Sequence, residues 1–181
     1  HLLREPFASK ARIALTGYNS IDYLPAMLAI IEVGKVACPV SVRLPQPEQM
    51  RLAESLDAPV LDTTTLDWPG IDQTPVRELS SCWNIEQPAT VIATSGSSGE
   101  PKLALLTVGN HYYNALGSHE NLPFQAGDRW LVSLPLYHIG GMALLFRALL
   151  HGGTLVFAHP EQKITEAIGE HQISHLSLVP T

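Results

Sequence analysis

Short apolar runs that alternate with helical runs constrain the fold of this chain more than any other feature. Residues 12–17 (RIALTG) and 35–40 (KVACPV) have the pattern of buried strands, and residues 19–34 between them have that of a helix. Asn19 is a favoured residue at a helix start, and Gly34 is favoured at a helix end. A strand, a helix and a strand joined by short links predict a parallel pair with a right-handed crossover.

Beyond residue 40, a short helix is expected within 44–58, and residues 62–88, rich in Asp, Thr, Pro and Gln, are expected to form surface loops. From residue 89 onwards the chain again alternates between expected strands and helices. We therefore predict an α/β fold with mainly parallel β-sheets flanked by helices. The further expected strands are 89–96, 103–107, 128–136, 154–159 and 174–180, and the further expected helices are 108–120, 140–153 and 161–172.

Composition excludes several classes of function. The 181 residues fit one domain, and a net charge of −6 gives no general attraction to nucleic acid or anionic lipid. Cys38 and Cys82 have no metal-ligand spacing and are expected to be reduced thiols. No signal peptide and no apolar run of membrane-spanning length is seen. We expect a cytoplasmic protein without a membrane span or a nucleic-acid partner; the sequence indicates no oligomeric state.

The stretch TSGSSGEPK, residues 94–102, places glycines and hydroxyl side chains directly after a predicted buried strand. Glycines allow successive backbone N–H groups to point inwards and bind an anion. The hydroxyls add donors, Pro101 stiffens the exit, and Lys102 adds a positive charge. These are the parts of a phosphate-binding loop.

Three other glycine-rich signatures do not match this stretch. A Walker loop needs Gly-Lys followed by Ser or Thr, but Lys102 lies between Pro101 and Leu103. The glycine spacing of a dinucleotide fingerprint is missing. The Gly-x-Ser-x-Gly elbow fails because Glu100 stands at its second glycine position. For a Gly/Ser run alone, a flexible hairpin loop remains the alternative.

The whole string TSGSSGEPK resembles the phosphate-binding signature of the adenylate-forming superfamily, which contains acyl-CoA synthetases, adenylation domains and luciferases. The segment DRWLVSLPLYHIGGM, residues 128–142, is similar to the part of that family in which an aromatic residue and a histidine close the acyl pocket. The stretches 34–47, 145–153 and 175–181 resemble most closely the members that form the CoA thioester of 2-succinylbenzoate, an aromatic diacid of menaquinone synthesis.

The resemblance implies a two-step reaction. A carboxylate attacks the α-phosphate of ATP to give an acyl-adenylate and pyrophosphate, and the CoA thiol then displaces AMP. ATP, Mg²⁺ and CoA are the implied cofactor and co-substrates. The implied phosphate-binding residues are Thr94, Ser95, Gly96, Ser97, Ser98, Gly99 and Lys102, and the implied substrate-binding residues are His138, Gly140, Gly141 and Arg147.

Arg147 also stands out by its surroundings in the sequence. It is the only charged residue of MALLFRALL, and its helical neighbours Ala143 and Gly140 are small. A pocket arginine would hold the second carboxylate of a diacid by a paired, charge-assisted bond. The alternative is an arginine that extends to solvent, and the alternative for His138 is a structural histidine. Gly140 replaces a serine found in some relatives, so any substrate contact there uses backbone N–H.

The expected domain organisation is that of a fragment. Residues 1–181 correspond to part of an N-terminal AMP-binding domain, divided into 1–88 and 89–181, with the mobile C-terminal domain absent. The catalytic lysine of the family lies in that domain and is not Lys102, so no catalytic residue and no metal ligand is assigned here. The fragment is not expected to form the thioester alone. Another acyl- or aryl-acid ligase, an adenylation domain and a non-catalytic nucleotide-binding module are the alternatives.

Overall fold

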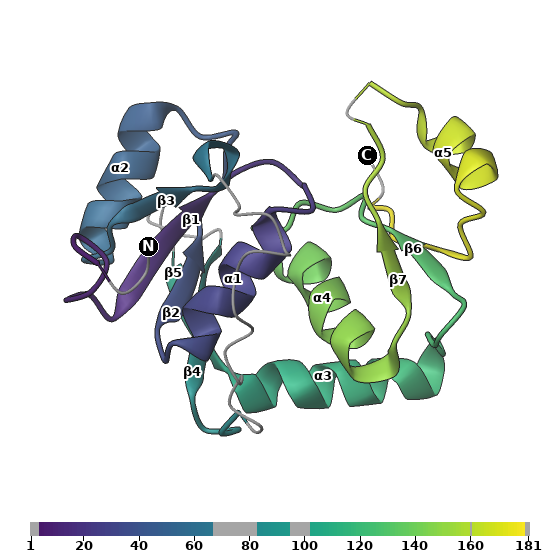
Figure 1. Ribbon diagram of the computed structural model, residues 1–181, viewed down its shortest axis with the longest axis horizontal. Coiled ribbons are helices and arrows are strands. Elements are labelled where there is room, and N and C mark those ends of the chain that lie inside the picture. Colours follow the sequence, from purple (N-terminus) through teal and green to yellow (C-terminus); the bar gives the residue numbers. More distant parts are fainter. Residues whose placement is uncertain (1–3, 67–82, 95–101, 160, 180–181) are drawn as a thin grey trace, which may run out of the picture. The chain divides into compact units, whose positions relative to one another are not determined.

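The computed structural model describes residues 4–66, 83–94, 102–159 and 161–179 (Figure 1). The chain divides into two compact units, one made of His1–Tyr18 with Asp22–Val108 and the other of Asn19–Ile21 with Gly109–Thr181. The boundary expected after residue 88 does not coincide with this division, because β4 (Pro88–Thr94) and β5 (Lys102–Thr107) belong to the first unit. As a subdomain boundary of the complete domain, it stays a prediction. No helix in the described ranges is long and apolar enough to cross a membrane.

The first unit is built on a five-stranded sheet with the order β3-β1-β2-β4-β5. Its first four strands are parallel, and β5 pairs with β4 in the antiparallel direction. The parallel crossover predicted for residues 12–40 is thereby confirmed. The strands are β1 (Arg12–Thr16), β2 (Val36–Pro39), β3 (Val60–Asp62), β4 (Pro88–Thr94) and β5 (Lys102–Thr107), with α1 (Tyr23–Glu32), α2 (Gln46–Ser55) and the 3₁₀ turn η1 (Thr63–Thr65) between them.

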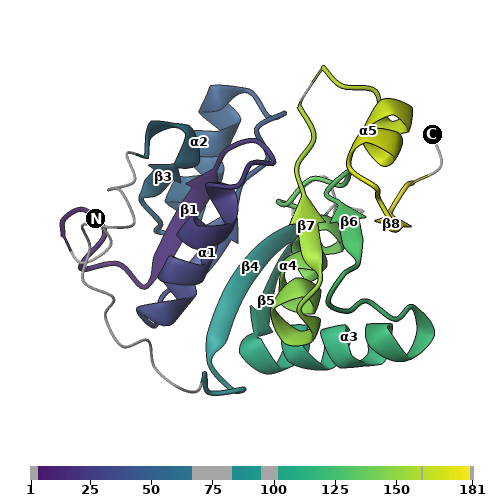
Figure 2. The ribbon, with the colours of Figure 1, turned by 45° about the vertical axis from the view of Figure 1, so that its right-hand side comes forward.

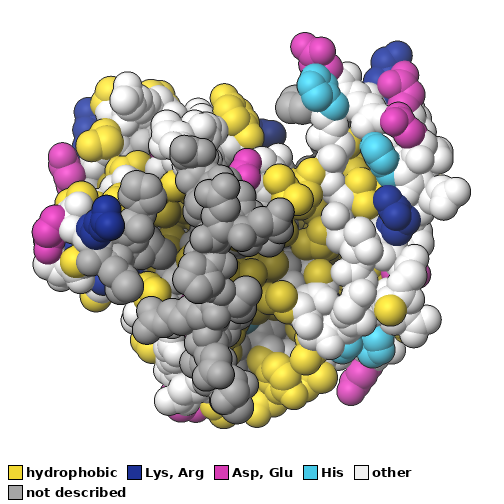
Figure 3. Space-filling model, viewed as in Figure 1, with side chains coloured by type: hydrophobic (Ala, Val, Ile, Leu, Met, Phe, Trp, Pro, Cys, Tyr) yellow, Lys and Arg dark blue, Asp and Glu magenta, His cyan; other side chains and the backbone are white. Residues whose placement is uncertain are grey.

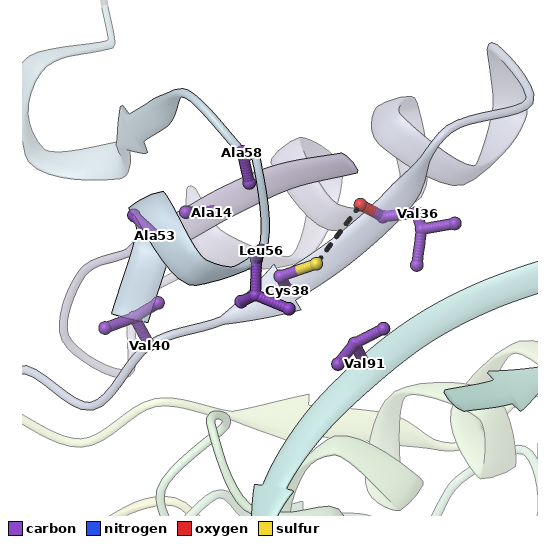
Figure 4. Close-up of a cluster of buried hydrophobic side chains, with 8 residues drawn as sticks. All are labelled: Ala14, Val36, Cys38, Val40, Ala53, Leu56, Ala58 and Val91. Atoms are coloured by element: carbon purple, nitrogen blue, oxygen red, sulfur yellow. Dashed lines mark hydrogen bonds between the residues drawn. The ribbon is translucent and has the colours of Figure 1, made fainter. Parts of the chain in front are cut away.

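A small-residue core joins α2 to this sheet (Figure 4). Ala53 and Leu56, at the end of α2, pack with Ala14, Cys38 and Val91 of three strands. The Cys38 thiol lies 3.8 Å from the Val36 carbonyl oxygen. Burial raises the pKa of this thiol to about 11, so Cys38 acts as a small apolar core residue.

The start of α1 differs from the sequence-based expectation. The helix begins at Tyr23, and the preceding Asp22 makes no capping hydrogen bond through its side chain. Asn19 therefore does not cap this helix; its carboxamide instead binds the backbone of residues 132–136. The expected end at Gly34 is confirmed, because Gly34 has φ +77° and its N–H donates to the Ile31 carbonyl.

The second unit contains a three-stranded parallel sheet with the order β7-β6-β8. Apolar side chains of its strands form two clusters, one with Leu144 of α4 and one with Ala167 of α5. Since successive residues of a strand face opposite sides, the neighbours Trp130 and Leu131 belong to different clusters, and α4 and α5 cover opposite faces (Figure 2). The elements are α3 (Val108–Asn121), β6 (Arg129–Leu131), α4 (Ile139–His151), β7 (Thr154–Val156), α5 (Ile164–Glu170) and β8 (His175–Leu176).

A buried histidine joins α3 to α4. The His111 ring stacks on Phe146 with centroids 4.1 Å apart and planes inclined by 7°. Burial lowers the pKa of His111 to about 4, so the imidazole stays neutral in the folded chain.

This histidine predicts a loss of stability in acid. The unfolded chain takes up a proton at His111 below its ordinary pKa of about 6.5, whereas the folded chain does so only near 4. The contribution of neutral His111 to the free energy of unfolding is therefore fully present above about pH 6.5, and it is lost as the pH falls towards 4. Between pH 7 and pH 5 the group should lower the free energy of unfolding by about 2 kcal/mol.

The measurement is urea unfolding at both pH values. His111→Phe keeps an apolar ring at this position and removes the titrating group, so its decrease between pH 7 and pH 5 should be about 2 kcal/mol smaller. An equal decrease in the variant and the parent chain would contradict this assignment.

Candidate functional site

The β4–β5 hairpin holds the two ends of the glycine-serine loop together. Thr94, the last residue of β4, pairs with Lys102, the first residue of β5. The Thr94 hydroxyl donates to the Lys102 carbonyl oxygen at 3.2 Å. Both residues are exposed. The expected phosphate-binding residues Ser95, Gly96, Ser97, Ser98 and Gly99 lie outside the described residues.

The direction of the strands decides where this loop leaves the sheet. Because β1, β2, β3 and β4 are parallel, their carboxyl ends lie at one edge, and Thr94 is the carboxyl end of β4. Ligands of open α/β sheets bind outside the carboxyl ends of the strands. The carboxyl end of β4, at Thr94, therefore lies at the edge where such sheets bind their ligands.

In the second unit, residues 132–138 connect β6 to α4 and carry two of the predicted substrate-binding features. Tyr137 is buried, His138 is exposed, and their ring centroids lie 4.7 Å apart. His138 occupies the position before the first residue of α4 with extended backbone angles. The His138 ring is thus placed at the helix start, where backbone N–H groups favour an anionic ligand.

The two glycines at the start of α4 differ in their surroundings. A Cβ atom on Gly141 would lie 2.7 Å from the Leu134 carbonyl oxygen, with the Pro135 carbonyl nearer still. A Cβ atom on Gly140 would meet only the Cδ1 atom of Leu134 at 3.2 Å. The Gly141 N–H already donates to the His138 carbonyl at 3.1 Å. Gly141 therefore serves close packing, and its N–H has a partner within the protein.

Arg147 lies over the ring of Trp130, with its guanidinium carbon 5.3 Å from the ring centroid. Trp130 is fully buried, and its ring neighbours are His175 at 5.0 Å and Phe124 at 5.2 Å. Burial lowers the pKa of Arg147, which nevertheless remains protonated at neutral pH. Among the described residues, neither Arg147 Nε nor Trp130 Nε1 has a hydrogen-bond partner, although both atoms are buried. The stacked pair thus contributes two buried donors without partners in the described part of the second unit.

We looked for basic side chains on one face of the molecule and for metal-ligating side chains among the described residues. On the face drawn in Figure 3, the Lys and Arg side chains stand apart from one another among acidic and histidine side chains. Within the described ranges, no group of three His, Cys, Asp or Glu side chains is placed to hold a metal ion.

Sequence reasoning missed two residues of this region. Asn19 was assigned to a helix cap, although its partners lie more than a hundred residues further along the chain. Trp130 was treated only as part of a strand, and its aromatic character within the segment 128–142 was the available signal.

Comparison with known proteins identifies the family. Residues 55–181 match the family of AMP-binding enzymes, and the chain belongs to that family. The 2-succinylbenzoate–CoA ligase of Bacillus pumilus is 36% identical over 128 residues, which cover 69% of this chain and 26% of that relative. The ligase of the same name from Listeria innocua is 29% identical over 180 residues, covering 92% and 38%.

Solved structures show the same fold. The o-succinylbenzoate CoA synthetase (MenE) of Bacillus subtilis, in complex with the acyl-adenylate intermediate OSB-AMP, matches with a TM-score of 0.78 and 26% identity, covering 93% of this chain and 49% of that one. The E. coli MenE bound to an analogue of OSB-AMS matches with a TM-score of 0.74 and 27% identity, covering 93% and 38%. The predicted α/β fold is confirmed, and the chain spans half or less of the length of these relatives.

The packing around the two glycines predicts opposite outcomes of the same substitution. Gly141→Ala should lower the free energy of unfolding by about 1–3 kcal/mol, because its Cβ meets backbone oxygens that cannot move away easily. Gly140→Ala is the matched control and should be neutral, because the flexible end of Leu134 can shift. Chemical denaturation of both variants is the measurement; equal stability of the two would contradict the packing argument.

Proposed function

We propose that this chain is the N-terminal part of an acid–thiol ligase that activates 2-succinylbenzoate with ATP and then forms its CoA thioester. The observation that carries the proposal is the loop 94–102 at the carboxyl edge of the parallel strands, in a member of the AMP-binding enzyme family. The relatives named 2-succinylbenzoate–CoA ligase support the choice of acid. The water-soluble substrates of this reaction, a diacid, ATP and CoA, favour the cytoplasm.

The phosphate-binding step is assigned to the hairpin and its loop. Residues 94–102 would hold the β- and γ-phosphates, with Lys102 as a point charge and the Thr94 hydroxyl at the loop entrance. In the first step negative charge accumulates on the leaving pyrophosphate, and donors fixed before the reaction stabilise it without reorganising. The hairpin fixes the backbone at both ends of the loop. A magnesium ion would arrive with ATP and share the phosphate charge.

The acyl-binding step is assigned to the second unit. His138 and Gly140 would line the pocket, and Gly141 would let α4 approach the segment before it. Arg147 would bind the carboxylate that is not activated. Its stacking on Trp130 fixes the plane of the guanidinium, and the unpartnered donors Arg147 Nε and Trp130 Nε1 supply a chemical reason for an anionic ligand nearby.

Removing the charge of Lys102 tests the phosphate assignment. Lys102→Ala should weaken ATP binding roughly 10- to 100-fold, the worth of a charge-assisted hydrogen bond. Isothermal titration of the chain with ATP and Mg²⁺ measures it. Lys163→Ala removes another exposed lysine and serves as the control. Equal affinities of Lys102→Ala and Lys163→Ala would remove Lys102 from the site.

Substitution of Arg147 tests the choice of a diacid. In the full-length ligase, Arg147→Lys keeps the charge but loses the planar fork, so KM for 2-succinylbenzoate should rise about tenfold or more while KM for ATP is unchanged. Pyrophosphate release measures both constants. Aromatic acids without the second carboxylate form the control panel. An unchanged KM for the diacid, or better turnover of a monoacid by the parent enzyme, would favour a different ligase of the family.

A further inference from the structure

We propose that Asn19 is a positioning residue that holds segment 132–138 in the shape required for acyl binding. The inference rests on the proposed function for its effect on substrate, but its structural part can be tested without any enzymatic activity. Asn19 lies in the connection between β1 and α1, far from this segment in the sequence.

One carboxamide satisfies three backbone groups of the segment. Its Nδ2 atom donates to the Val132 carbonyl at 3.2 Å and to the Leu134 carbonyl at 2.8 Å. Its Oδ1 atom accepts from the Leu136 N–H at 3.0 Å. The side chain thus supplies the partners of three backbone groups in a stretch whose last hydrogen bond to β7 is from the Val132 N–H to the Val156 carbonyl at 2.9 Å.

Only a carboxamide provides this combination of donors and acceptor on a short side chain. Aspartate is nearly the same size and can still accept from Leu136 N–H, but it cannot donate to the two carbonyls and would repel them. Alanine removes all three bonds. A helix-capping role does not explain the residue, because α1 begins at Tyr23 and the side chain points to residues 132–136.

The bonds of Asn19 lie directly before the substrate-binding residues. Leu136 precedes Tyr137, and His138 is tied back by its N–H to the Pro135 carbonyl at 3.1 Å. The Leu134 carbonyl that accepts from Asn19 is also one of the two oxygens against which Gly141 packs. The Asn19 side chain and the close approach of Gly141 therefore constrain the same turn.

Loss of these bonds should raise KM for the acid and leave KM for ATP unchanged. The described hydrogen bonds of the Asn19 side chain all go to residues 132–136, and neither Thr94 nor Lys102 is among these partners. A residue that only supported global stability would alter both substrates alike.

Hydrogen exchange of the chain itself tests the structural part. The Leu136 amide should exchange at least tenfold faster in Asn19→Ala than in the parent chain, and should stay protected in Asn19→Asp, which keeps the acceptor. Asn121→Ala is the control, because it removes a carboxamide bond to the Gly117 carbonyl of α3 and should leave Leu136 unchanged. If Asn19→Ala does not fold, Asn19→Ser is measured in its place. Equal exchange at Leu136 in Asn19→Ala, or in Asn19→Ser where it replaces Ala, and the parent would overturn the proposal.

Pyrophosphate release by the full-length enzyme tests the effect on substrate. Asn19→Ala and Asn19→Asp should each raise KM for 2-succinylbenzoate about tenfold and leave KM for ATP within twofold. A parallel rise in both constants would overturn the positioning role. If the parent enzyme does not activate the diacid, the proposed function fails, while the exchange result for Leu136 still decides the role of Asn19 in the segment.

Discussion

The parallel arrangement of the four strands β1, β2, β3 and β4 is the constraint on which the rest of the first unit depends. It brings the carboxyl ends of four strands to one edge, so that a loop following any of them opens at the same place. The reversal of direction at β5 then closes the glycine-serine loop into a hairpin whose base is fixed by Thr94 and Lys102. The paired strands thus fix the backbone at both ends of the segment to which phosphate binding is assigned in the proposed function.

The sequence predicted those features that arise from local chemistry. Apolar runs predicted the order of strands and helices. Gly34 predicted the end of α1, because glycine is the residue favoured in the left-handed conformation, here φ +77°, that ends many helices. Strand lengths were predicted less well. The strand expected over 128–136 is only Arg129–Leu131. The Val132 N–H still donates to Val156 of β7, but beyond it the Leu134 carbonyl and the Leu136 N–H bond to the Asn19 side chain.

In the candidate site too, features set by consecutive residues could be predicted, and features set by tertiary contacts could not. TSGSSGEPK could be recognised because its residues are consecutive, and its phosphate-binding role remains a proposal. The environment of Arg147 could not be predicted, because Trp130 approaches it only when β6 and α4 pack together. The misplaced role of Asn19 has a related cause: a local rule favours Asn at helix starts, while a contact across more than a hundred residues leaves no periodic signal.

The polar side chains of the second unit include both a well-bonded carboxamide, that of Asn19, and buried donors without partners among the described residues. Asn19 bonds to three backbone groups of residues 132–136, and this shared network holds the segment in one conformation. Arg147 Nε and Trp130 Nε1, by contrast, are buried without hydrogen-bond partners among the described residues, and buried donors of this kind favour a polar partner. Under the proposed function, a carboxylate bound beside these two donors would give them partners, which would favour an anionic acid over a neutral one.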